Sequence, residues 1–287
     1  MKKILVAMLL MWVTSALSQD QQAQQVWSGR LSDSMCAASH QMKAAAGKMS
    51  ERECLFECIK ALASYVLVDD KQQVIPIATQ DLGGLPLYAG RPVRITGRLK
   101  DGSIVATKIE AIPAHLHLGH VMTNWRDTPA NVGFLIIAIS DSKIAATHAD
   151  LAARSGSLDD TKLHAGHVLN ALDSNIEPKG PASGYSVKKA ASGALQHLEF
   201  AVQAEGVTTN IKTHAAPASA SLKKVLEWTE QAVSNAQKIR ATNSTSDAAA
   251  LTNQLAALTK NIADGLQQAK AEMDLIMKGE GLENAPR

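Results

Sequence analysis

The chain has 287 residues, about twice the length of a typical single domain, so we expect two domains. Apolar residues make up 46% and charged residues 20%, a balance that builds a core and excludes a globally disordered chain. The 29 basic residues nearly match the 27 acidic ones and form no long basic tract, which excludes nucleic acid as the expected partner. Aromatic residues make up only 3%, and this composition favours packed helices.

The first eighteen residues predict a secretory signal peptide. Lys2 and Lys3 give it a positive start, Ile4–Val13 an apolar run, and Ala16-Leu17-Ser18 the small residues read by a signal peptidase. The apolar run is shorter than the roughly 20 helical residues that span a bilayer. We therefore expect an exported bacterial protein, periplasmic or secreted, with no transmembrane anchor after cleavage.

The predicted fold class is α+β, and residues 26–112 form its first domain. A helix is expected at Glu51–Ala63 with Ser50 as its N-cap. Runs rich in β-branched residues predict strands at Val26–Leu31, Ser64–Asp69, Gln73–Ala78, Pro92–Leu99 and Ile104–Ile109. Short strands with one helix suggest a small OB-like β-barrel, partly closed.

Residues 114–280 predict an all-α antiparallel bundle, because long Ala-rich segments follow one another with short breaks. The last segment has apolar residues three and four apart, from Leu251 to Ile276, which indicates one buried stripe. The expected helices are Val132–Arg154, Asp159–Ala171, Gly184–Ala204, Val207–Arg240 and Ala248–Met277.

Histidines recur in this second domain in the manner of an internal repeat. Eight of the nine lie between His115 and His214. His117-Leu-Gly-His120-Val-Met is matched 47 residues later by His164-Ala-Gly-His167-Val-Leu, and His148 is matched by His197 49 residues later. The pattern predicts a duplicated helical hairpin whose imidazoles face one common interior point. We also expect the glycine inside each pair to allow a close approach of another helix or a ligand.

This register favours a transition-metal site, since imidazole binds zinc, copper, nickel and iron. The alternative is that each histidine is an ordinary hydrogen-bonded residue of the core or surface and binds no metal. No Asp or Glu stands three residues before any histidine, which argues against a carboxylate-bridged di-iron site, and the covalent haem motif is absent. We expect the bound metal to be copper or zinc rather than iron. The predicted ligands are His117, His120, His148, His164, His167, His197 and His214, with Asp127, Asp173, Asp150 and Glu199 orienting their rings.

A second candidate site lies in the first domain, which contains all three cysteines. Cys36 precedes His40 by four residues, and Cys54 precedes Cys58 by four. Three thiolates and one imidazole form a typical structural zinc set. The alternative is a disulfide from Cys36 to Cys54 or Cys58, as expected in an oxidising compartment. Unpaired buried thiols are a third possibility, and the sequence leaves all three open.

The residues from Trp27 to Cys36, with His40, Cys54 and Cys58 and the segment Ala89–Gly97, resemble a small exported bacterial OB-like domain of unknown function. The resemblance implies fold and export only. The His-rich part resembles uncharacterised exported helical proteins and implies no catalytic residue.

Four functions remain open from the sequence. The first is an exported protein that binds a metal ion for homeostasis or delivery. The second is a haem-binding electron carrier with two of His120, His148, His167 and His197 as axial ligands. The third is a non-catalytic scaffold that binds another envelope protein through its amphipathic helices. The fourth, an enzyme that activates water or oxygen on a metal, has no recognisable substrate pocket in the sequence.

Overall fold

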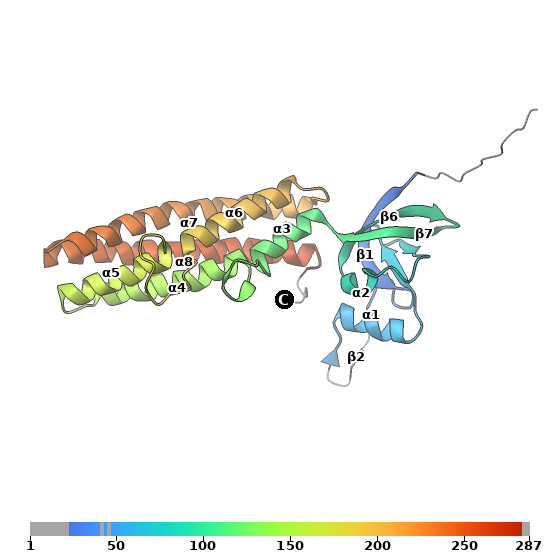
Figure 1. Cartoon of the computed structure of the whole chain (residues 1–287), viewed down its shortest axis with the longest axis horizontal. Helices are drawn as coiled ribbons and strands as arrows, with labels where there is room; N and C mark the ends of the chain where they lie inside the picture. The colour runs from blue at the N-terminus through green and yellow to red at the C-terminus, as the bar shows by residue number, and fades with distance from the viewer. Residues whose placement is uncertain (1–22, 41–42, 45–46, 283–287) are drawn as a thin grey trace, which may run out of the picture.

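The computed structural model describes residues 23–40, 43–44 and 47–282. The predicted signal peptide, residues 1–18, lies outside this range. Figure 1 shows two parts: a sheet region, residues 23–112, lies at one end of an elongated helical region, residues 113–282. Their buried apolar residues form two separate clusters, one from Leu31 to Ala106 and one from Ile112 to Met277.

The sheet region contains a five-stranded antiparallel sheet with the order β5-β4-β1-β6-β7. The strands are β1 (Gln25–Asp33), β4 (Tyr65–Val68), β5 (Val74–Pro76), β6 (Pro92–Lys100) and β7 (Ser103–Ala111). All five predicted strands are present, with shifted ends. A separate hairpin joins β2 (Lys43–Ala44) and β3 (Gly47–Lys48).

The prediction of a barrel is wrong in one respect, because the sheet is not closed. Ile77, which directly follows edge strand β5, forms an isolated parallel bridge with Ile104 of the other edge strand, β7, next to one backbone hydrogen bond of 2.8 Å from Ala78 to Ile104. β5 spans only three residues, Val74–Pro76. Pro76 lacks an N–H group for a ladder, so a long pairing with β7 does not form here.

Helix α1 (Glu51–Lys60) begins where the sequence predicts. The Ser50 side chain accepts a hydrogen bond from the Glu53 N–H group, and the Glu53 carboxylate accepts one in return, forming a capping box. Its buried residues are Cys54, Leu55 and Cys58. The packed face of α1 therefore carries two of the three cysteines. The one-turn helix α2 (Leu85–Tyr88) was not expected.

The five helices expected in the second part are present, and a sixth precedes them. They are α3 (Pro113–Met122), α4 (Phe134–Ala153), α5 (Leu158–Leu172), α6 (Val187–Gln203), α7 (Thr209–Ala241) and α8 (Thr245–Gly279). The additional helix α3 starts at a proline, whose missing N–H group has no partner in a first turn in any case. A 3₁₀ turn, Pro129–Asn131, precedes α4.

Helices distant in the chain are neighbours in space, and this positions the histidines. α3 packs against α6, while α4 packs against α5, α6 and α8 (Figure 1). The carboxylate of Asp141 on α4 is fully buried and accepts hydrogen bonds from the Ser183 N–H and hydroxyl groups and from the Ser186 N–H. Because Ser186 is the N-cap of α6, Asp141 fixes the start of that helix on α4.

Within the described residues, no helix combines the length and apolarity needed to cross a membrane.

Candidate metal centres

The first histidine cluster lies between α3 and α6. His117 and His120 are one turn apart on α3, and His197 projects from α6. The Nδ1 atom of His197 lies 3.1 Å from Nδ1 of His117 and 3.2 Å from Nδ1 of His120. We call these three residues triad A.

The second cluster repeats this arrangement between α4 and α5. His164 and His167 are one turn apart on α5, and His148 comes from α4. The Nδ1 atom of His148 lies 3.1 Å from Nδ1 of His164 and 3.3 Å from Nδ1 of His167. We call these residues triad B.

Each triad combines the histidine pair of one copy of the sequence repeat with the single histidine of the other copy. In sequence, the pair His117/His120 belongs with His148, and the pair His164/His167 belongs with His197. In space, each pair meets the single histidine of the other copy. One copy of the repeat comprises α3 and α4 and the other α5 and α6, so neither copy alone contains a complete triad.

The distances between the nitrogens suit a bound ion better than hydrogen bonds between rings. A neutral imidazole nitrogen has either one proton or one lone pair, so Nδ1 of His197 makes at most one good hydrogen bond, although two neighbours lie within 3.2 Å. Three nitrogens bound to zinc at 2.0–2.1 Å with tetrahedral angles lie about 3.3 Å apart. The distances from His197 to its two partners in triad A, and from His148 to its two partners in triad B, come within a few tenths of an ångström of this spacing, and all ligand atoms of a triad lie within 4.8 Å of one another.

Aromatic side chains surround triad A. Trp125 lies 4.7 Å from His120 and 5.0 Å from His197, measured between ring centroids. Phe134 lies 5.4 Å from His197, and Phe200 lies 5.3 Å from His117. These rings exclude water from one side of the cluster.

This enclosure keeps the imidazoles of triad A uncharged. Burial, and secondarily the neighbouring imidazoles of His120 and His117, lower the pKa of His197 to about 4. Burial also lowers the pKa of His117, and burial together with the nearby His117 lowers that of His120. Rings that stay neutral near pH 7 keep the lone pair that a metal ligand requires.

Two histidines of triad B, His148 and His167, also have lowered pKa values. Burial, followed by repulsion from His167 and His164, lowers the pKa of His148. Burial and His164 lower the pKa of His167 and outweigh the opposing effect of Glu177.

The expectation of a single interior point for all seven histidines is not what the structure shows. The imidazoles converge at two separate points, triad A and triad B, and His214 lies at neither. Its Nδ1 atom pairs with Glu272 on α8 at 2.8 Å. His115, which was not expected as a ligand, pairs through Nε2 with Glu280 at 2.8 Å.

Three of the four acidic residues expected behind the histidines, Asp127, Asp173 and Glu199, pair with basic side chains of the protein instead. Asp127 is largely exposed and pairs with Arg126 at 3.6 Å. Asp173 follows α5 and pairs with Lys188 at 3.0 Å. Glu199 faces Lys223, and the Asp150 carbonyl accepts a hydrogen bond from Arg154.

The glycines inside the two pairs also differ from the expectation of close packing. A Cβ atom on Gly119 would meet nothing within 4 Å, and one on Gly166 would meet only the Arg240 side chain at 3.9 Å. No close approach of a helix requires either glycine.

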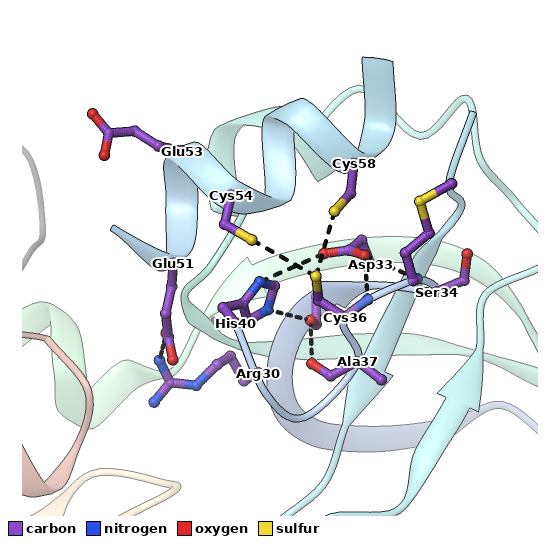
Figure 2. A network of polar contacts seen from close by, with 12 residues as sticks. Arg30, Asp33, Ser34, Cys36, Ala37, His40, Glu51, Glu53, Cys54 and Cys58 are labelled. Carbon is purple, nitrogen blue, oxygen red and sulfur yellow. Dashed lines mark hydrogen bonds and ion pairs between the residues drawn. The ribbon is translucent and has the colours of Figure 1, made fainter. Parts of the chain in front are cut away.

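The predicted cysteine cluster is assembled where α1 packs against the end of β1 (Figure 2). Sγ of Cys36 lies 3.7 Å from Sγ of Cys54 and 3.5 Å from Sγ of Cys58, and no disulfide joins them. His40 lies beside Cys36.

Sequence reasoning missed one member of this cluster. Asp33, the last residue of β1, is fully buried and groups with Cys36 and Cys58. Its position three residues before Cys36 could have suggested it. The aromatic residues around triad A were also missed, because they come from three separate segments of the chain.

Comparison of the chain with protein-family models, with curated proteins and with solved structures gives no match.

Proposed function

We propose that the chain is an exported protein that binds transition-metal ions, zinc or copper, in two equivalent three-histidine sites, for metal homeostasis or delivery. In this proposal an OB-like sheet domain, residues 26–112, precedes an antiparallel helical bundle, residues 114–280. Export depends on residues 1–18, which lie outside the described range. The observation that carries the proposal is that in each of two clusters the Nδ1 atom of one histidine lies 3.1–3.3 Å from the Nδ1 atoms of a histidine pair on the neighbouring helix.

The number of protein ligands in each triad, three, supports a role as a metal carrier. Structural zinc sites are closed by four protein ligands, whereas three leave a tetrahedral ion one position for water or an incoming ligand. An ion with an open position exchanges ligands readily, as delivery to another protein requires. Imidazole nitrogens also suit zinc and copper more than calcium or magnesium, which prefer oxygen.

The same geometry argues against haem between members of one triad. Two axial ligands must lie on opposite faces of the porphyrin with its plane between them. His120 and His197, or His148 and His167, are separated by only 3.2 and 3.3 Å at Nδ1, which leaves no room for the ring.

Substitution of one histidine in each triad tests the proposal. We expect His197→Ala to lower the zinc content of the loaded protein by one equivalent, His148→Ala by one, and the double variant by two. The measurement is elemental analysis after incubation with zinc chloride and desalting, with circular dichroism to confirm folding. His214→Ala is the matched control and keeps the full content, because His214 pairs with Glu272 outside both triads. Unchanged zinc in the folded double variant would contradict the proposal.

A further inference from the structure

The cysteine cluster has a different ligand chemistry from the triads. Cys54 and Cys58 project from the buried face of α1 toward Cys36, which lies in the loop after β1 (Figure 2). Tetrahedral zinc with bonds of about 2.3 Å to sulfur places its sulfur atoms about 3.8 Å apart. Sγ of Cys36 lies 3.7 Å from Sγ of Cys54 and 3.5 Å from Sγ of Cys58, and both distances approach this value. The ligand atoms that lie within 4.8 Å of one another form two sets that share Cys36, one with His40 and Cys54 and one with Asp33 and Cys58.

Two buried polar atoms beside the thiols have no hydrogen-bond partner. They are Oδ2 of Asp33 and Nδ1 of His40, 3.6 Å apart on side chains that are 0% and 3% exposed. A buried polar atom without a partner costs about 1–3 kcal/mol, and more when it is charged. A cation placed among these atoms and the thiols would remove this cost.

The hydrogen bonds around His40 fix which of its nitrogens is available. The Ser32 hydroxyl donates its only proton to the Ala37 carbonyl at 2.6 Å. Its oxygen therefore accepts from Nε2–H of His40, 2.8 Å away. Nδ1 of the neutral ring then carries the lone pair, and it faces the cluster. Ligand histidines in metal sites are held by outer hydrogen bonds of this kind.

Asp33 organises the loop that carries the first thiol. Its Oδ1 atom accepts hydrogen bonds from the backbone N–H groups of Met35, at 2.9 Å, and Cys36, at 2.8 Å. These bonds hold Cys36 opposite α1 and leave Oδ2 directed toward the cluster (Figure 2). The carboxylate thus adds negative charge beside the position that a cation would occupy.

We propose that the sheet region holds one zinc ion through the thiolates of Cys36, Cys54 and Cys58 and Nδ1 of His40, with Asp33 beside it. Four protein ligands close the coordination sphere, so this ion is structural and links the loop after β1 to α1. It is a third site, unlike the open three-histidine sites, and it does not depend on them.

Cobalt substitution tests this site independently of the triads. Cobalt bound to thiolates gives an intense sulfur-to-metal charge-transfer band in the near ultraviolet, which imidazole ligands do not give. We expect this band in the reduced, cobalt-loaded full chain, its loss in Cys54→Ser, and its retention in the double variant His148→Ala/His197→Ala. Glu57→Gln, an exposed position on α1, is the matched control and keeps the band.

A second measurement in the unchanged protein covers the case in which Cys54→Ser fails to fold. Zinc should slow the reaction of the thiols with a disulfide reagent at least tenfold, and a chelator should restore the rate. A reduced protein that lacks the band and whose thiols react equally fast with and without zinc would overturn the proposal. That outcome would not contradict the proposed function, which is tested separately by the zinc that the histidine variants lose.

Discussion

Zinc binding to both triads is expected to raise the free energy of unfolding of the helical region by up to about 8 kcal/mol. A ligand that binds only the folded state at a thousand times its Kd contributes about 4.1 kcal/mol per site. The gain is an upper value, because histidines of the unfolded chain also bind zinc. Each ion ties helices from both copies of the repeat, α3 to α6 and α4 to α5, so its release must accompany opening of the helical region.

The measurement is chemical denaturation followed by the helical circular dichroism signal, with zinc and with chelator. His197→Ala and His148→Ala should each keep about half of the zinc-dependent gain. The double variant should keep none of it, and His214→Ala should behave as the parent protein. A double variant with the full gain would show that zinc stabilises the helices from somewhere other than the triads.

Replacement of Glu280 by Ala is expected to cost about 3–5 kcal/mol, the loss typical of a broken buried pair. Glu280 follows α8, and three groups donate to its carboxylate: Nε2 of His115 at 2.8 Å, the Thr208 hydroxyl at 2.5 Å and Nδ2 of Asn210 at 2.9 Å. The contact joins the end of α8 to the starts of α3 and α7. Without the carboxylate, Nε2 of His115 and the Thr208 hydroxyl lose the acceptor of these hydrogen bonds, whereas Nδ2 of Asn210 keeps its bond of 3.2 Å to the Ile276 carbonyl. The measurement is the denaturant midpoint, and Glu280→Gln, which keeps an acceptor oxygen, should lose less than half as much.

The same residue gives stability a defined dependence on pH. Burial by itself would raise the pKa of Glu280, but hydrogen bonds from His115, Thr208 and Asn210 outweigh it and hold the pKa below its ordinary value of 4.5. A carboxyl with a lowered pKa in the folded state stabilises the fold above pH 4.5, and this contribution is lost as pH falls through the folded pKa. We therefore expect Glu280→Gln to reduce the loss of stability between pH 5 and pH 3. An equally steep loss in the variant would assign the acid sensitivity to other groups.

The sequence predicted the elements and the histidine register well, because both depend on local patterns. The helix beginning after Ser50 followed from a cap visible in the sequence, and α8 from an apolar stripe. The repeated spacing of His117/His120 and His164/His167 identified both pairs. These features are set within one or two turns of a helix.

Partner choice between distant helices could not be predicted in this way. His197 meets His117 and His120 because α6 packs against α3, although α4 and α5 separate these two helices in the chain, and Ala-rich helices offer several similar packing faces. The same limit explains the missed Asp33, whose role exists only because α1 folds back over the end of β1. It also explains why the ion pair between Asp173 and Lys188 of α6 was not predicted.

We propose that each triad encloses one ion through its three Nδ1 atoms. Crystals of the zinc-loaded protein, measured at the zinc absorption edge, test it most directly. We expect one anomalous peak between His117, His120 and His197 and a second between His148, His164 and His167, each about 2.0–2.1 Å from three Nδ1 atoms. Loaded crystals with no peak at either position, or with zinc bound only to surface side chains, would contradict it.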